Sequence, residues 1–197
     1  MNGELKQLTL FILGNSSVGK TSFIHKYVKN DFKDSYTNTI GMDYCSRNMK
    51  LPTGEEFEIF FYDTAGQEKY KSISFNLIKK ADGILLLYDI SERSSFDAIN
   101  QWIENIKNVK GDNFPVIMIG NKCDLEERDI TQIEGELFAN EHGFSFEETS
   151  CKEGINIEES VQDLVLNILE KKKKENLKEN FTFKLSKKKE KKKKCCK

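Results

Sequence analysis

The fold is decided by the stretch Gly14-Asn15-Ser16-Ser17-Val18-Gly19-Lys20-Thr21. It fits the pattern G-x-x-x-x-G-K-[ST], and its surroundings suit that pattern, because residues 7–13 predict a buried strand and residues 20–29 a helix. Glycines let such a loop curl until backbone N–H groups point at phosphates, and the helix N-terminus adds a positive end. We therefore expect phosphate contacts from this loop and the first helical turn, at Gly14, Ser16, Ser17, Val18, Gly19, Lys20, Thr21 and Ser22. Lys20 reaches the β- and γ-phosphates in this prediction, and the Thr21 hydroxyl ligates Mg²⁺.

Outside this loop, apolar patterns predict strands that alternate with helices. Strands are expected at 44–51, 57–62, 83–88, 116–119 and 144–146, and helices at 96–109, 131–142 and 157–168. The turn 52–54 joins the first two of these strands into a hairpin, and Ser94 is the expected cap of the 96–109 helix. The pattern indicates an α/β fold with a six-stranded, mostly parallel sheet, one antiparallel edge strand and helices on both faces. Ligands of such sheets bind beyond the carboxyl ends of the strands.

A possible base-binding motif, Asn121-Lys122-Cys123-Asp124, follows the strand at 116–119. Guanine presents two adjacent donors, and one carboxylate accepts both, so Asp124 is expected to select guanine over adenine. Asn121 is placed to bridge toward guanine N7 and the phosphate loop, while the Lys122 stem lies over the base. Backbone N–H groups after the last strand are expected to meet guanine O6, at Ser150, Cys151 and Lys152.

The charge of the chain is unevenly divided. Residues 1–170 hold 17 Lys and Arg against 29 Asp and Glu, a net charge of −12, whereas residues 171–197 hold 14 Lys and 3 Glu, a net charge of +11. We predict a domain over 1–170 and a disordered Lys-rich tail over 171–197, which meets an anionic surface. The longest apolar stretch, Ile84–Tyr88, is far shorter than the ~20 residues of a membrane span. Without an export signal, we expect reduced cysteines in the cytosol.

Together these motifs resemble those of the Ras-like small GTPases, over roughly residues 5–170. The finer resemblance is to the Rab family. Asp63-Thr64-Ala65-Gly66-Gln67-Glu68 resembles its second switch, and Thr39-Ile40-Gly41-Met42-Asp43-Tyr44 its first switch and the following strand. Residues 69–73 and 83–90 are also similar. Tyr62 replaces a usual Trp, residues 77–81 depart from the family pattern, and Cys151 stands where Ala is usual. The changes near 77–81 concern partner contacts rather than nucleotide binding.

The resemblance implies a P-loop GTPase, or G domain, that binds GTP and GDP with Mg²⁺. It implies that Gln67 orients the attacking water and that the Gly66 N–H contacts the γ-phosphate. Mg²⁺ is then held by Thr21, by Asp63 acting through a water, and by Thr39 only when the γ-phosphate is present. Phe32 is expected to meet the edge of the base, although its position also suits a core residue at the end of the first helix. Intrinsic hydrolysis is expected to be slow, with an activating protein adding ~10³–10⁵-fold.

The chain ends in Cys195-Cys196-Lys197, which resembles the Rab double-cysteine ending that receives two geranylgeranyl groups. Two lipid chains give stable anchoring, and lysines near an anionic leaflet add ~1 kcal/mol each. The resemblance implies a monomer on the cytoplasmic face of an intracellular membrane, cycling with the cytosol and regulating vesicle-mediated protein transport. The implied partners are effectors, an exchange factor, a GTPase-activating protein and prenylation or escort proteins.

Three other functions remain open at this point. A GTP-binding scaffold that does not hydrolyse is disfavoured by Gln67 and Thr39. An ATP-dependent kinase or ATPase is disfavoured by Asp124. A nucleic-acid binder that uses the tail is disfavoured by the acidic body, which repels phosphates, so no nucleic acid is expected as a partner. The tail alone is also compatible with a solvated Lys run that carries two incidental thiols.

Overall fold

A computed structural model describes residues 5–30, 42–64 and 78–194 of the 197-residue chain. Its centre is a six-stranded sheet in the order β2-β3-β1-β4-β5-β6, in which β2 and β3 are antiparallel and the other neighbours parallel. The predicted fold class, with one antiparallel edge strand, is therefore confirmed. The strands are β1 (Lys6–Leu13), β2 (Met42–Lys50), β3 (Glu56–Thr64), β4 (Gly83–Asp89), β5 (Val116–Asn121) and β6 (Ser145–Thr149).

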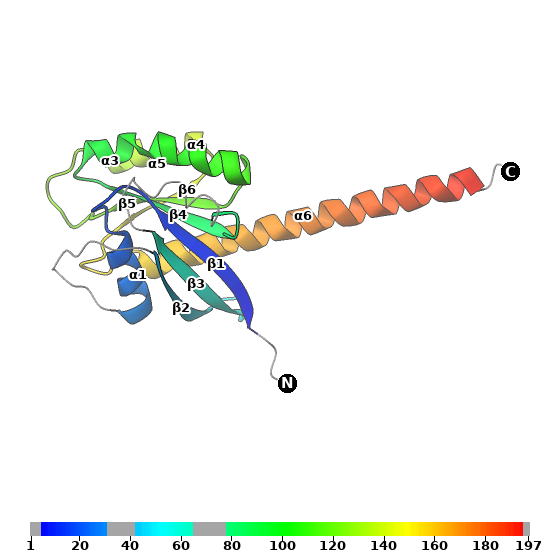
Figure 1. The fold of residues 1–197 in the computed structure, drawn as a ribbon, viewed down its shortest axis with the longest axis horizontal. Helices are drawn as coiled ribbons and strands as arrows, with labels where there is room; N and C mark the ends of the chain where they lie inside the picture. The colour runs from blue at the N-terminus through cyan, green and yellow to red at the C-terminus, as the bar shows by residue number, and fades with distance from the viewer. Residues whose placement is uncertain (1–4, 31–41, 65–77, 195–197) are drawn as a thin grey trace.

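Helices cover both faces of this sheet (Figure 1). One face carries α1 (Lys20–Lys29) and the first turns of α6 (Ile157–Lys194), and the other carries α3 (Arg93–Asp97), α4 (Ile99–Lys110) and α5 (Gln132–Glu141). Successive residues of a strand point to opposite faces, so Leu10 and Ile12 join the core under α1 and α6, while Phe11 and Leu13 join the core under α4. Burying a large apolar side chain contributes ~1.5–3 kcal/mol, so the continuous apolar strands hold both layers on the sheet.

The predicted helix over 96–109 is divided at Ala98 into α3 and α4. Neither part has a side-chain cap, so the prediction that Ser94 caps this segment is wrong. The Ser94 hydroxyl donates to the Glu92 carboxylate at 2.7 Å instead. The buried neighbour Ser95 satisfies the backbone at this point, because its hydroxyl accepts from the Asp89 N–H at 2.9 Å and bonds the Glu92 carbonyl at 2.8 Å.

The last helix continues well beyond the domain. Lys-rich composition predicts disorder from Lys171, whereas the backbone of α6 is helical to Lys194 and projects away from the sheet (Figure 1). Lys and Glu are good helix formers, and residues 157–194 contain neither Gly nor Pro. Pairs one turn apart, such as Lys171 with Glu175 at 3.8 Å, add to this tendency. At ~1.5 Å per residue α6 is ~57 Å long. The division at residue 170 stays a prediction.

The candidate site residues are gathered at one edge of the sheet. β1 leads into the loop 14–19, and Asp63, Asp89, Asn121 and Thr149 lie at the carboxyl ends of β3, β4, β5 and β6. The parallel strands place these ends side by side, as the register of Asp89 opposite Asn121 and Asn121 opposite Thr149 shows. Within the described ranges, no helix has both the length and the apolar character of a membrane span.

Candidate functional site

The loop between β1 and α1 is shaped by two glycines. Gly14 has φ +140° and Gly19 has φ +99°, backbone conformations that side chains rarely adopt. A Cβ atom would lie 2.2 Å from the Leu87 carbonyl oxygen at Gly14, and 2.2 Å from the Asn121 Nδ2 atom at Gly19. The loop therefore needs glycine twice, once to lie against β4 and once to lie against the residue that ends β5.

Lys20 is buried, and its ammonium lies inside the curve of this loop. Its Nζ donates to the carbonyl oxygen of Gly14 at 2.9 Å and to that of Asn15. Burial lowers the pKa of Lys20 to about 8, and the charge of nearby Asp63 opposes this effect. A buried ammonium of this kind gains from an added anion, which is the arrangement that a phosphate-binding loop requires.

Thr21 and Asp63 form a pair of oxygen ligands beside Lys20. The Thr21 hydroxyl donates to the Asp63 Oδ2 atom at 2.6 Å, and Asp63 is buried. Mg²⁺ prefers oxygen ligands in octahedral geometry and keeps several waters, so a hydroxyl and a carboxylate next to a phosphate loop fit it. No cluster of three His, Cys, Asp or Glu is found in the described parts of the chain.

Asn121 joins the base-binding segment to the phosphate loop. Its Nδ2 donates to the Val18 carbonyl oxygen at 2.8 Å, and its Oδ1 accepts from the Thr149 hydroxyl at 3.1 Å. With an exposed fraction of 1%, the side chain is locked in place by these bonds. The predicted bridge toward the phosphate loop is present, and the contact with guanine N7 stays a prediction. Thr149 was not anticipated from the sequence, since only the fold brings it to Asn121.

Asp124 is held by the segment that follows β6. The Ser150 hydroxyl donates to its Oδ1 at 2.6 Å and accepts from the Glu153 N–H at 3.0 Å. The same two segments are also joined by Arg128, whose guanidinium donates to both Glu148 carboxylate oxygens at 3.1 Å. The carboxylate that is expected to read the base is thus oriented before any base is bound.

Cys151 and Lys152 complete the segment after β6. Cys151 is buried, with its Sγ 3.4 Å from the Asn121 Oδ1 atom, and burial raises the pKa of its thiol to about 12. Lys152 is exposed. The backbone N–H groups of both residues are predicted to contact guanine O6. The Cys151 thiol also contacts Asn121, which the usual alanine at this position could not do.

Two further contacts at this edge were not predicted from the sequence. Lys122, which has φ +69°, places its ammonium 2.5 Å from the buried Asp89 carboxylate. The Trp102 indole N–H, on α4, donates to the Asn15 Oδ1 atom at 3.1 Å. A local signal existed only for the hydrogen bonds between Asp89 and Ser91, because an Asp two residues before a Ser at a strand end is typical of a side-chain turn.

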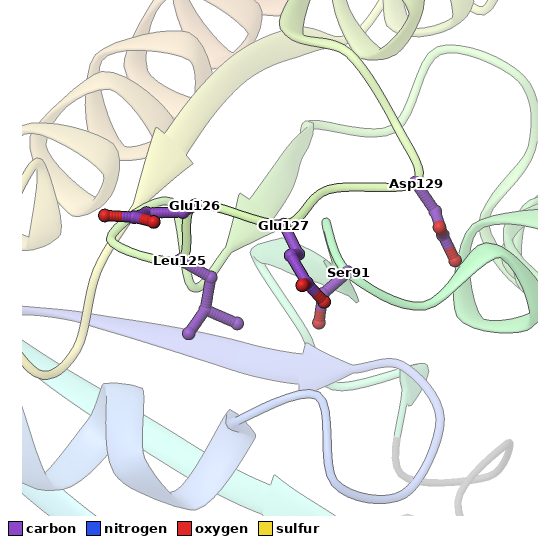
Figure 2. Close-up of a pocket in the computed structure, with 5 residues that line it drawn as sticks. All are labelled: Ser91, Leu125, Glu126, Glu127 and Asp129. Atoms are coloured by element: carbon purple, nitrogen blue, oxygen red, sulfur yellow. The ribbon is translucent and has the colours of Figure 1, made fainter.

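A separate pocket lies beside the base-binding segment and is lined by Ser91, Leu125, Glu126, Glu127 and Asp129 (Figure 2). In Figure 2 the side chains of Glu127 and Ser91 lie close together, while Asp129 stands apart on the next stretch of chain. Three carboxylates make this pocket unsuitable for a phosphate. The loop at residues 14–19, with the Lys20 ammonium inside its curve, suits the anionic part of a nucleotide better.

Several predicted site residues lie outside the described residues. They are Phe32, Thr39, Gly66 and Gln67 of the expected nucleotide site, and Cys195 and Cys196 of the expected lipidation site. Their roles stay predictions.

A mostly parallel sheet with a phosphate loop after β1, an Asp at the end of β3 and an N-K-x-D segment at the end of β5 defines a P-loop protein of the guanine-nucleotide-binding class. The model of the Ras family matches residues 9–170. The chain is 39% identical over 163 residues to the Ras-related protein Rab-3C of Bos taurus, covering 82% of this chain and 71% of the relative. It is likewise 39% identical to the Ras-related protein Rab-3B of Homo sapiens and 40% identical to the GTP-binding protein Rab-3D of Rattus norvegicus, in both cases covering 82% of this chain and 74% of the relative.

The chain therefore belongs to the Ras-like small GTPases and, among these, to the Rab family. Membership confirms the resemblance seen in the motifs. It identifies the protein as a GTPase and its ligand as a guanine nucleotide.

Proposed function

We propose that this protein is a Mg²⁺-dependent molecular switch that hydrolyses GTP slowly and recruits effectors in its GTP-bound state. The observation that carries the proposal is the hydrogen bond from Asn121 to the Val18 carbonyl, which joins the base-binding segment to the phosphate loop at 2.8 Å. One rigid frame thus holds the residues expected at both ends of a guanine nucleotide.

In the proposed mechanism the phosphate loop and Lys20 hold the β- and γ-phosphates by charge and backbone N–H groups. Thr21 and Asp63 would hold Mg²⁺, which would supply charge neutralisation when bound. Gln67 orients the attacking water. Hydrolysis is slow because none of the three arginines, Arg47, Arg93 and Arg128, lies in a predicted switch segment, so an activating protein is expected to supply ~10³–10⁵-fold.

Loss of the γ-phosphate releases the segments around 33–41 and 64–80 from their expected phosphate and Mg²⁺ contacts, and effectors read that difference. An exchange factor resets the switch by releasing GDP. The relatives named above are Rab proteins, and by analogy we propose a role in vesicle-mediated protein transport.

The proposed location is the cytoplasmic face of an intracellular membrane. Prenylation of Cys195 and Cys196 with the help of escort proteins provides the anchor, and the Lys-rich segment adds attraction to anionic lipid. We expect a Cys195→Ser/Cys196→Ser variant, expressed in cells, to move from the membrane fraction to the cytosol. Retention of this variant on membranes would show that another feature anchors the protein.

The first test is nucleotide binding and single-turnover hydrolysis by the purified full chain, with GTP, ATP and Mg²⁺ varied. We expect tight Mg²⁺-dependent GTP binding, slow turnover that is lost in Gln67→Leu, and a preference for guanine that falls by ~100-fold or more in Asp124→Asn. Asp129→Asn is the matched control, because Asp129 is an exposed carboxylate close by in the chain whose oxygen accepts from the Arg93 N–H. Binding without turnover would favour a scaffold, and equal use of ATP would overturn the base assignment.

A further inference from the structure

Asp89 is a buried carboxylate at the last position of β4. The proposed mechanism assigns no role to this residue. Its exposed fraction is 4%, and a buried carboxylate is costly unless each oxygen is satisfied. Oδ1 accepts from the Ser91 N–H at 2.9 Å and from the Ser91 hydroxyl at 2.7 Å. Oδ2 lies 2.5 Å from the Lys122 ammonium. The carboxylate is therefore fixed in orientation, with one oxygen reserved for Lys122.

Lys122 is held at both of its ends. Its backbone has φ +69°, a left-handed conformation that is unfavourable for a residue with a Cβ. That conformation is maintained by its neighbours, since the Cys123 N–H donates to the Thr149 carbonyl at 3.0 Å and the Leu125 N–H donates to the Lys122 carbonyl at 3.0 Å. At the other end of the side chain, Asp89 holds the ammonium. The four-carbon stem between them has few conformations left.

This restriction matters because Lys122 is the residue whose stem is expected to cover the guanine base. A free lysine loses much rotamer freedom when it is ordered, and that cost falls on the binding event unless the protein has already ordered the side chain. Asp89 also lies opposite Asn121 in the register of β4 and β5, so the ion pair is joined to the strand that carries the base-binding segment.

We propose that Asp89 is a positioning residue for guanine-nucleotide retention, which acts by holding Lys122 in its base-covering conformation. The inference rests on the proposed contacts of Lys122 with the base. Asp89 contacts neither the phosphate loop nor Asp63 among the interactions of the described residues, so it acts on nucleotide dissociation and leaves the chemical step unchanged.

The test measures GDP dissociation and single-turnover GTP hydrolysis for the full chain and for Asp89→Asn, with Mg²⁺ present. We expect dissociation to become about 5–20-fold faster, which corresponds to about 1–2 kcal/mol, while the hydrolysis rate of bound GTP stays within about twofold. Faster dissociation together with slower hydrolysis, or unchanged dissociation, would overturn the proposal.

Asp82→Asn is the matched control for a structural role. Asp82 lies just before β4, is half-buried, accepts from the Thr9 N–H at 2.9 Å and pairs with Lys172 at 2.7 Å. Its environment resembles that of Asp89, but it lies at the end of the strand away from the site. We expect Asp82→Asn to lower the melting temperature and to leave GDP dissociation unchanged.

A double-mutant cycle with Lys122→Gln shows whether Asp89 acts through Lys122. If it does, Asp89→Asn has no further effect on dissociation once Lys122 is replaced. If Asp89 only stabilises the strand ends, its effect on dissociation persists in the Lys122→Gln background, and the proposal is wrong. Failure of the unaltered protein to bind GDP would instead count against the proposed function itself.

Discussion

An aspartate paired with a lysine lies at each end of β4, but the two ion pairs have different roles. Asp82 and Asp89 each accept a backbone N–H and each pair with a lysine. The lysine of Asp82 is Lys172 on α6, so that pair ties the sheet to a helix. The lysine of Asp89 is Lys122 in the base-binding segment, so that pair orders a ligand site. In a parallel sheet, strand direction decides which role an ion pair takes, because only the carboxyl ends face the ligand.

Glycine substitution is expected to give the largest difference in GDP binding between the carboxyl and amino ends of the sheet. Gly19 at the carboxyl end and Gly54 in the β2–β3 hairpin have φ +99° and +88°, but only Gly19 has an atom within reach of an added Cβ, 2.2 Å away. Gly19→Ala should weaken GDP binding by ~100-fold or more, because the loop must shift from Asn121. Gly54→Ala should cost only about 1 kcal/mol of folding free energy. Titration with fluorescent GDP and urea unfolding check this, and equal losses of binding would remove the contrast.

The next largest effect is a pH dependence of GDP affinity, which is expected from Lys20 at the carboxyl end of the sheet. Burial lowers the pKa of Lys20 to about 8, and a bound phosphate stabilises the ammonium and raises that pKa. Binding therefore takes up a proton above pH 8, so affinity for GDP should fall as pH rises, by up to about tenfold per pH unit.

Dissociation constants between pH 7 and pH 9 measure this dependence on pH. Lys20→Gln should bind weakly with a flatter profile. Lys110 is the control at the amino end of the sheet, where burial also lowers its pKa. Lys110→Gln should leave the profile of GDP binding unchanged, and a changed profile would show that the two ends are coupled.

A smaller effect is expected at the ion pair behind Asp124. Arg128→Gln leaves the buried Glu148 carboxylate without its cation, which should cost about 1–3 kcal/mol of folding free energy. Because Glu148 precedes the segment that holds Asp124, GDP dissociation should also become about fivefold faster, equivalent to about 1 kcal/mol. Lys6→Gln breaks the exposed pair with Glu55 at the amino end of the sheet and should change neither the folding free energy measurably nor GDP dissociation, because solvent screens this pair.

The smallest effect is expected at Cys151. Its thiol is a weak hydrogen-bonding group, so Cys151→Ala should change GDP dissociation by no more than about twofold. Since burial raises the pKa of this thiol to about 12, it should stay unmodified by a thiol reagent at pH 8 until the protein unfolds. Mass spectrometry after labelling checks this, and rapid labelling of Cys151 in the folded protein would show that its segment opens.

The sequence allowed the sheet and the positions of the motifs to be predicted, because continuous apolar runs and the glycine loop are local signals. It predicted Lys20, Thr21, Asp63, Asn121 and Asp124 at the carboxyl edge, where the structure brings them together. For Lys20, Thr21, Asn121 and Asp124 this needed only a motif and the rule that ligands bind beyond strand ends, whereas Asp63 came from the resemblance to the Rab family.

The partners of these residues could not be predicted in the same way. Asp89 with Lys122, Thr149 with Asn121 and Trp102 with Asn15 are contacts between residues far apart in the chain, and no local pattern encodes them. For residues 171–194, two signals in the sequence point in different directions. Composition favours disorder there, whereas intrinsic helix propensity without Gly or Pro favours the continued helix.

Trp102 is the only tryptophan of the chain, and its indole N–H is hydrogen-bonded to Asn15 in the phosphate loop. The emission of this indole depends on its hydrogen bond and on the polarity around it. The protein therefore carries its own optical probe of the loop, and the loading and release of unlabelled nucleotide can be followed in real time from its intrinsic fluorescence.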